Sequence, residues 1–318
     1  MTFASCSADF FTHDGYTWGT SFHIIYKSDQ NLDGRIDSVL KAIDRELSMF
    51  NDSSTVSAIN SGRSATASAA FRDVFDISTA VSALSHGLYD PTVGPLTSLW
   101  GFGREDIDST PGDSAIEAAL LTVGIAECGI ADDMSVSKKH PATCFDFSSV
   151  AKGYGVDRVA KLLDDNGVRD YMIEIGGEIT ARGHSPKMRP WNIQIDAPTG
   201  GMAHESLTVM PLGPAKTSIA SSGNYRNVRR DSDGNFYGHT LSPISGRPVA
   251  GNVLAATVSA ADCATADALA TACMACGDAD SAMSMLRRAG AEGLLVVSLG
   301  DSMTTAMTDK FCPGKPLF

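Results

Sequence analysis

Residues 146–168, DFSSVAKGYGVDRVAKLLDDNGV, decide how the middle of this chain folds. Two serines and Ala-Lys-Gly are followed there by apolar residues at helical spacing, and Gly167 stands where a helix often ends with a positive φ. Small residues before the helix leave its first backbone N–H groups accessible at the positive end of the helix dipole, and Lys152 adds one cation there. The stretch therefore predicts a helix whose first turn is a candidate phosphate site.

The composition is that of a globular protein with an excess of acidic residues. The chain has 318 residues, 43% of them hydrophobic, which is enough for one large domain with a sizeable core. The formal net charge is -12 and basic residues form no dense run, which argues against sequence-independent nucleic-acid binding. No apolar run approaches the ~18 residues of a membrane-spanning helix. An anionic substrate would have to be met by a metal ion or a few basic groups.

The N-terminal residues 2–7, TFASCS, resemble the end of a bacterial lipobox, in which a cysteine after small residues is acylated. The charged and apolar parts of a signal peptide do not precede Cys6 in this chain. Cys6 is therefore either the acylated residue of an envelope lipoprotein or an ordinary residue of a frayed terminus. We expect residues 1–12 to form an N-terminal tail and residues 13–318 to form a single domain.

Hydrophobic periodicity predicts strands that cluster between pairs of helices. The predicted strands are 20–29, 170–183, 191–198, 252–260 and 293–300, and the predicted helices are 35–50, 70–87, the segment after 150 and an Ala-rich segment after 264. Residues 88–103 are expected to form a loop, and residues 217–227 and 238–249 are expected to form loops with strand edges. Because strands and helices do not alternate strictly, the pattern favours α+β over a doubly wound parallel sheet.

Two hard oxygen donors, Asp267 and Thr271, stand four residues apart near the start of a predicted helix. This spacing puts them on one face, where they could hold Mg²⁺ together with carbonyl, water and phosphate oxygens. The alternative is that Asp267 only caps the helix. His239, in a predicted loop, is either a general acid or base, a phosphate contact or an ordinary surface histidine.

Aromatic residues and a cysteine pair allow two interpretations each. Trp100 and Phe102 either line a ring-binding wall or fill core beneath the loop that contains them. Cys273 and Cys276 form a C-x-x-C without a second pair or a neighbouring histidine pair, so zinc is not expected, and buried packing or redox pairing remain. P-loop and Rossmann glycine fingerprints are absent, so any nucleotide is bound by another route.

Eight segments, in order along nearly the whole chain, resemble the ApbE family of FAD:protein FMN transferases. They are WGTSFHI, LSMFNDSSTVSAIN, YDPTVGPLTSLWGFG, DFSSVAKGYGVDRVAKLL, IEIGGEITARG, SIASSGNYRN, GHTLSPISGRPV and ADALATA. The resemblance implies an α+β, T-fold-related domain with a mixed sheet, packed helices and two intimate subdomains. It also implies an Mg²⁺-dependent enzyme that moves FMN from FAD to a threonine of an acceptor protein and releases AMP.

The resemblance also implies the residues of the site. The metal would be held by Asp267, Thr271 and the main-chain carbonyl of Ser149, and His239 would be the catalytic base or proton relay. The implied FAD contacts are Trp18, Phe50, Thr92, Val93, Gly94, Asp146, Lys152 and Leu241.

The sequence departs from the family pattern in two places. Ser242 stands where the family commonly has Asp, and a carboxylate lost near His239 could weaken the orientation or basicity of that histidine. Ser148 and Ser149 stand where Gly or Ala is common, a change that a backbone ligand tolerates.

The implied partners are FAD and a flavin-acceptor protein of an envelope electron-transfer system, without nucleic acid. The implied location is the periplasmic face of the cell envelope, with membrane attachment only through a lipid on Cys6. Two alternatives stay open beside the transferase. One is an Mg²⁺-dependent FAD diphosphatase that gives FMN and AMP, and Asn51 beside Phe50 leaves that choice open. The other is a non-catalytic FAD-binding envelope lipoprotein.

Overall fold

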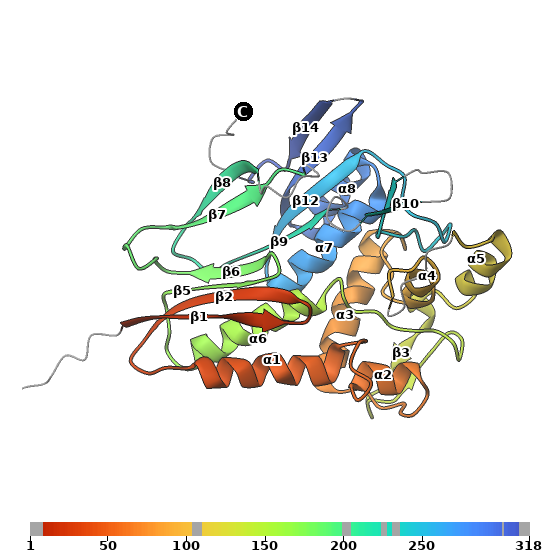
Figure 1. Ribbon diagram of the computed structural model, residues 1–318, viewed down its shortest axis with the longest axis horizontal. Coiled ribbons are helices and arrows are strands. Elements are labelled where there is room, and N and C mark those ends of the chain that lie inside the picture. The colour runs from red at the N-terminus through yellow and green to blue at the C-terminus, as the bar shows by residue number, and fades with distance from the viewer. Residues whose placement is uncertain are drawn as a thin grey trace, which may run out of the picture.

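A single large sheet organises the protein. The computed structural model describes residues 9–103, 110–198, 205–223, 228–230, 236–300 and 302–311. The sheet has eight strands in the order β1-β2-β5-β6-β9-β12-β13-β14, and helices lie against it along most of its length (Figure 1). Within the described ranges, none of the helices combines the length and the apolar character needed to cross a membrane.

The elements have the following bounds. The strands of the large sheet are β1 (Asp9–Thr17), β2 (Thr20–Ser28), β5 (Tyr171–Ile175), β6 (Glu178–Arg182), β9 (Thr217–Gly223), β12 (Val253–Ala260), β13 (Glu292–Leu299) and β14 (Ser302–Met307). Three small ribbons pair β3 (Gly129–Ile130) with β4 (Val136–Ser137), β7 (Trp191–Asp196) with β8 (Ser206–Leu212), and β10 (Val228–Arg230) with β11 (Phe236–Gly238). The helices are α1 (Asp33–Leu47), α2 (Thr55–Asn60), α3 (Ala69–Leu84), α4 (Gly94–Leu99), α5 (Asp113–Leu120), the 3-10 turn η1 (Ile125–Glu127), α6 (Ala151–Asp165), α7 (Cys263–Cys276) and α8 (Ala279–Ala289).

Tight turns make the sheet antiparallel. Trp18 and Gly19, with φ of 50° and 76°, join β1 to β2, and Gly176 and Gly177, with φ of 62° and 99°, join β5 to β6. Such turns reverse the chain, so the strands that they connect pair antiparallel. The expected α+β class is confirmed, but the sheet expected to be mixed is antiparallel at every pairing among its described strands.

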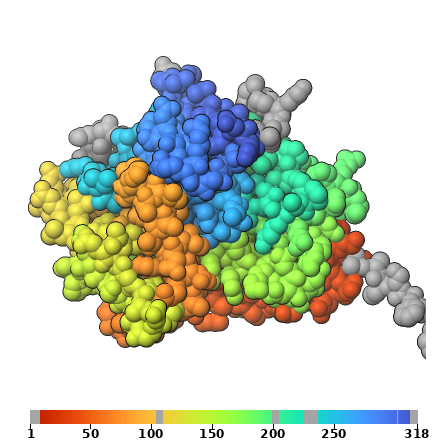
Figure 2. Space-filling view, turned by 180° about the vertical axis from the view of Figure 1, so that it is seen from behind, coloured from red at the N-terminus to blue at the C-terminus, as the bar shows by residue number. Residues whose placement is uncertain are grey.

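The two faces of the sheet bury different partners. Ile173 of β5 belongs to one apolar cluster with Val159 and Leu163 of α6. The residue just before it, Met172, packs instead with Trp191 of the β7–β8 hairpin. This division follows from the alternation of side chains along a strand. Figure 2 shows the molecule from behind, where α3 in orange runs beside the blue C-terminal segment, and α3 packs against α7 and α8.

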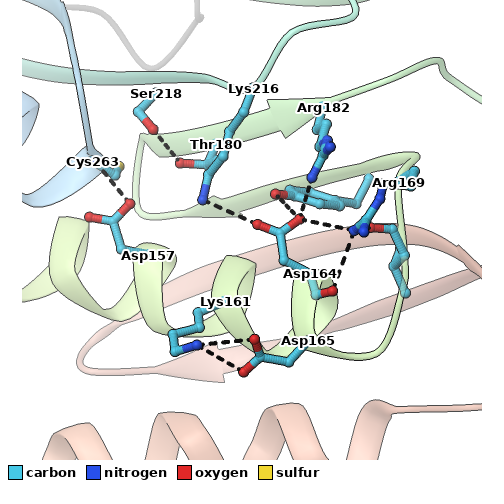
Figure 3. Close-up of polar contacts among 12 residues, drawn as sticks. Asp157, Lys161, Asp164, Asp165, Arg169, Thr180, Arg182, Lys216, Ser218 and Cys263 are labelled. Atoms are coloured by element: carbon cyan, nitrogen blue, oxygen red, sulfur yellow. Dashed lines mark hydrogen bonds and ion pairs between the residues drawn. The ribbon is translucent and has the colours of Figure 1, made fainter.

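Asp164 ties the C-terminal end of α6 to the sheet (Figure 3). One of its carboxylate oxygens accepts hydrogen bonds from Arg182 Nη1 at 2.8 Å and from the Tyr171 hydroxyl at 3.2 Å. Lys216 Nζ, just before β9, lies 3.5 Å from the other oxygen. Gly167, with φ of 76°, then turns the chain from α6 toward β5, as its position in the sequence predicts.

Three segments differ from the expectation drawn from the sequence. Residues 88–103 contain a short helix, α4, because a proline is tolerated in the first helical turn. Residues 170–183, expected as one strand, form the β5–β6 hairpin because two glycines reverse the chain there. Residues 217–223, expected as a loop with strand edges, form the regular strand β9, which pairs with β6 and β12; its short polar residues concealed its burial in the sheet.

The predicted N-terminal tail is shorter than expected. The strand β1 begins at Asp9, inside the range 1–12, because Phe10 and Phe11 lie opposite residues of β2. The ring of Phe11 stacks on Tyr26 with 5.4 Å between centroids. Cys6 lies outside the described residues.

Candidate active site

A cleft with two lobes lies where the start of α6 meets α7 and the segment 239–241. The smaller lobe has a volume of about 320 Å³, and the larger lobe has a volume of about 960 Å³. The wall that the two lobes share consists of Thr97, Asp146, Ser148, Lys152 and His239. The two lobes are therefore adjacent, and together they are large enough for a ligand with two ring systems.

The smaller lobe gathers most of the residues that the sequence singles out. Its lining includes Val93, Asp146, Ser149, Lys152, His239, Leu241, Asp267 and Thr271. Trp18 and Phe50 line the larger lobe. The fold thus brings residues from six distant segments of the chain to one cleft.

Thr92 and Gly94 support the smaller lobe from behind. The Thr92 hydroxyl is fully buried; it donates to Asp90 Oδ1 at 2.6 Å and accepts from the Gly124 N–H at 2.7 Å. A Cβ at Gly94 would lie 3.0 Å from the carbonyl oxygen of Cys144. These contacts give the two residues a structural role, while their contact with FAD stays a prediction.

Asp267 is held inside the smaller lobe, with only 2% of its surface exposed. Its Oδ2 accepts the N–H of Gly153 at 3.0 Å. Burial raises the pKa of its carboxyl, against the lowering effects of the Lys152 charge and the Gly153 N–H. The N-cap of α7 is Asp262, whose side chain accepts from the Thr265 N–H at 2.7 Å. The alternative that Asp267 caps this helix is therefore wrong.

Glu178, which the sequence analysis did not single out, pairs with Lys152. Lys152 Nζ donates to Glu178 Oε1 at 2.5 Å. Glu178 is only 1% exposed, and its Oε2 has no hydrogen-bond partner in the part of the chain that the structure describes. Burial raises the pKa of Glu178 to about 8, although the Lys152 charge opposes this. Burial also lowers the pKa of Lys152, but the charges of Asp267 and Glu178 outweigh it and raise that pKa above its usual range.

The donor set of the smaller lobe fits a hard divalent cation. Asp267 offers a carboxylate and Thr271 a hydroxyl, which lies 3.3 Å from the Ser222 hydroxyl. In a regular helix the N–H of Gly153 would bond to the Ser149 carbonyl, but it donates to Asp267 instead. The Gly153 N–H therefore does not occupy that carbonyl oxygen.

Asp267 would need other oxygen ligands beside it. The described residues contain no group of three or more His, Cys, Asp or Glu side chains that could hold a metal ion. A cation here would therefore depend on a hydroxyl, a backbone carbonyl, water and substrate oxygens in addition to one carboxylate. Two buried carboxyl groups, Asp267 and Glu178, lie near one partly exposed cation, Lys152, whose charge acts on both.

The first turn of α6 offers fewer N–H groups to a phosphate than expected. The N–H of Ala151 donates to the Phe147 carbonyl at 2.8 Å, and the N–H of Tyr154 donates to the Val150 carbonyl at 3.0 Å. The N–H of Gly153 is taken by Asp267. A phosphate at this turn would therefore depend on Lys152 and a metal ion rather than on a set of backbone donors.

Two glycines in the AKGYG segment let other parts of the site approach α6. A Cβ at Gly153 would lie 2.3 Å from the carbonyl oxygen of Cys263 in α7. A Cβ at Gly155 would lie 2.2 Å from the indole ring of Trp18. Trp18 lines the larger lobe, and its Nε1 is buried without a hydrogen-bond partner among the described residues. The segment thus serves close packing as well as binding.

His239 lies in the wall between the two lobes. Its ring meets the edge of Phe102 at 6.2 Å between centroids. Ser242, where the family commonly has Asp, accepts from the N–H groups of Ile244 at 3.3 Å and Ser245 at 3.1 Å. In this chain the residue therefore stabilises a turn, and these bonds assign it no contact with His239.

Trp100 and Phe102 have different roles. Trp100 is buried and donates from Nε1 to the Gly246 carbonyl at 2.8 Å, so it fills core. Phe102 lines the larger lobe, a position that suits the predicted ring-binding wall. Cys273 and Cys276 both belong to α7, and Cys273 is fully buried. Burial raises the thiol pKa of Cys276 to about 11, which favours the packing interpretation of this pair.

A cleft that combines a buried carboxylate, a lysine, a histidine and aromatic walls defines an enzyme site for a large anionic substrate. Residues 18–295 match the ApbE family. An FAD:protein FMN transferase of Vibrio cholerae serotype O1 is 33% identical over 309 residues, which cover 94% of this chain and 91% of the relative. The enzyme of the same name from Escherichia coli K12 is 30% identical over 310 residues, which cover 94% and 87%.

Solved structures agree with this family. The flavin transferase ApbE of Vibrio cholerae superposes with a TM-score of 0.85 at 31% identity, covering 96% of this chain and 98% of that chain. The Pseudomonas stutzeri flavinyl transferase ApbE, in its apo form, gives a TM-score of 0.82 at 30% identity, covering 95% and 96%. The chain belongs to the ApbE family. The resemblance seen in the sequence and the expectation of an enzyme are confirmed.

Proposed function

We propose that the protein transfers FMN from FAD to a threonine hydroxyl of an acceptor protein, with Mg²⁺ bound and with release of AMP. Flavin transfer follows from membership of the ApbE family. The metal, the threonine and the AMP product are the further parts of the proposal. The observation that carries them is the convergence of Asp267, Thr271, Ser149, Lys152 and His239 on one lobe.

The diphosphate of FAD would lie in the smaller lobe. A chain with a net charge of -12 must supply a local counter-charge for this anion. Mg²⁺, when bound by Asp267, Thr271 and the Ser149 carbonyl, would neutralise the charge that develops on the diphosphate. Lys152 adds a fixed positive charge that its pairing with Glu178 holds in place.

The rings of FAD would use the larger lobe. Trp18, Phe50 and Phe102 line it and offer flat apolar surface with one indole N–H. Phe50 is 61% exposed in the absence of ligand, so a bound ring would cover apolar surface that now faces solvent.

His239 is proposed to accept the proton of the attacking hydroxyl. The hydroxyl oxygen bonds to the phosphorus of the FMN half, the bond from that phosphorus to the bridging oxygen breaks, and the bridging oxygen leaves with AMP. The proton passes to the imidazole, which can hold it near neutral pH. The position of His239 in the wall of both lobes suits this role, because it borders the proposed diphosphate and ring sites.

One experiment separates this proposal from its alternatives. The purified protein is incubated with FAD and Mg²⁺, with and without a flavin-acceptor domain, and AMP release and covalent flavin fluorescence on a denaturing gel are followed. Fluorescence on the acceptor that EDTA abolishes supports the transferase. AMP without a labelled acceptor indicates a diphosphatase, in which water is the nucleophile, and no AMP in any tube indicates a binding protein.

We also propose that the protein acts at the periplasmic face of the cell envelope, attached through a lipid on Cys6. The lipobox-like TFASCS supports this location. Mass spectrometry of the membrane fraction of cells that make the full natural chain would detect the acylated cysteine peptide. A soluble chain with an unmodified Cys6 would contradict the anchor.

A further inference from the structure

We propose that Asp157 is a positioning residue that fixes the spacing between the two halves of the metal site. One half, with Ser149 and Lys152, lies at the start of α6, and the other half, with Asp267 and Thr271, lies on α7. The inference rests on the proposed function, because it concerns the same metal site.

Asp157 joins the two helices through both oxygens of its carboxylate. Oδ1 accepts the N–H of Cys263 at 3.0 Å, and Oδ2 accepts the N–H of Ala264 at 2.9 Å. These are the first two residues of α7, and Figure 3 shows the Asp157 side chain reaching from α6 to Cys263. The first N–H groups of a helix have no partner within it, so a carboxylate from another helix satisfies them and complements the helix dipole.

A second contact lies one turn away on each helix. Gly153 is four residues before Asp157 on α6, and its N–H donates to Asp267 at 3.0 Å. Asp267 is four residues after Cys263 on α7. Residues four apart lie on one face of a helix, so the pairs Asp157–Cys263 and Gly153–Asp267 set the register of two antiparallel helix segments.

The helices have little room to shift apart or together at this crossing. A Cβ at Gly153 would lie 2.3 Å from the Cys263 carbonyl oxygen, so the two backbones are already in contact. Asp164 binds the other end of α6 to the sheet. The carboxylate of Asp157 is therefore the polar link that keeps the start of α7 against a helix that is fixed elsewhere.

Capping of α7 alone does not account for Asp157. The N-cap of α7 is Asp262, which accepts from the Thr265 N–H at 2.7 Å and comes from the same segment as the helix. Asp157 comes from α6, 106 residues away in the sequence from Cys263. Asp262 thus stabilises the helix end, whereas Asp157 also ties that end to the other half of the site.

The spacing matters because Mg²⁺ demands near-ideal octahedral geometry with short metal–oxygen distances. A small shift of α7 against α6 would move Asp267 and Thr271 relative to the Ser149 carbonyl. Partners that orient metal ligands from outside typically change metal affinity by about 10- to 100-fold when mutated. Metal affinity is therefore the sensitive measure of the proposed role.

The test compares Asp157→Asn with Asp262→Asn in the full chain without FAD. Binding of Mn²⁺, as a spectroscopic substitute for Mg²⁺, is followed by electron paramagnetic resonance. Thermal unfolding and FAD binding in EDTA are measured on the same samples. We expect Asp157→Asn to weaken Mn²⁺ binding by about 10-fold or more, and Asp262→Asn, which keeps a capping oxygen, to leave it unchanged, with metal-free FAD affinity little changed in both.

The outcomes separate the inference from the proposed function. Wild-type affinity for Mn²⁺ in Asp157→Asn, or equal weakening in Asp262→Asn, would overturn the positioning role and leave the metal site intact. Failure of the wild-type chain to bind Mn²⁺ both without FAD and with FAD present would overturn both. If Asp157→Asn does not fold, Asp157→Ser, which places no amide donor against the two N–H groups, is measured by the same criteria.

Discussion

The N–H of Gly153 donates to Asp267 Oδ2 over 3.0 Å, so the turn that begins α6 is bonded to the carboxylate proposed to hold the metal. The bond explains why a glycine stands at this position, since a side chain there would collide with the backbone of α7. It also occupies the Gly153 N–H, which could otherwise have donated to a phosphate. The helix start therefore organises the metal site rather than forming the phosphate site by itself.

Gly153→Ala should destabilise the fold and lower activity. The added methyl would lie 2.3 Å from the Cys263 carbonyl oxygen, and relief of this overlap must separate α6 from α7. We expect a loss of about 1–3 kcal/mol in the free energy of unfolding, measured by urea denaturation. Gly34→Ala in α1 is the matched control, because a Cβ there meets nothing within 4 Å. Equal stability of the two variants would contradict the tight crossing.

Asp267→Asn should reduce metal-dependent turnover by about 100-fold or more, because it removes the charged ligand of the proposed site. AMP release at increasing Mg²⁺ measures this loss, and FAD binding in EDTA should persist. Asp278→Asn is the control, since Asp278 caps α8 by accepting from the Ser281 N–H at 2.9 Å. Undiminished turnover in Asp267→Asn would remove the metal assignment.

Glu178→Gln should change how stability depends on pH. The pKa of Glu178 is raised from 4.5 to about 8 in the folded chain. Between pH 4.5 and pH 8 the carboxyl is therefore protonated in the folded state and ionised in the unfolded state. Stability from this group is therefore lost as the pH rises from about 4.5 to 8. The variant should lack this loss, giving a difference from wild type on the order of 4 kcal/mol between pH 5 and pH 8.

Urea denaturation in EDTA across this pH range measures the difference. Other buried acids, including Asp157, whose pKa burial raises to about 6, change stability in the same direction but are common to both proteins. Glu117→Gln, at an exposed position of α5, is the control and should follow the wild type. Parallel curves for wild type and Glu178→Gln would show that Glu178 does not titrate in this way.

His239→Ala should slow transfer while leaving FAD affinity nearly intact. General acid–base groups contribute about 10²- to 10⁴-fold to rate, so a loss in this range is expected in single-turnover labelling of the acceptor. His184→Ala is the control, because His184 lies beside Asp170 and lines neither lobe of the cleft. Loss of FAD binding with an unchanged rate constant would make His239 a phosphate contact instead.

Much of the local structure could be predicted from the sequence. The helices around 35–50 and 70–87 and the strand at 20–29 were expected from periodicity, because burial of one face repeats every 3.6 residues in a helix and every two in a strand. The segment of β9 was expected only as a loop with strand edges. Its short polar residues show no alternating apolar pattern, although the neighbouring strands bury them. The hairpin at Gly176 was missed because apolar residues continue on both sides of the turn.

The sequence by itself determined the fold class and the family, and most of the site residues expected from it line the cleft, because these depend on short motifs and local spacing. Only the tertiary structure decided that Glu178 pairs with Lys152, and that Asp157 caps a helix that begins 106 residues later. It also decided that Asp262 rather than Asp267 caps α7. The physical reason is that a buried charge needs a partner brought to it by packing, and the choice of partner depends on how helices and strands cross rather than on the residues beside it in the chain.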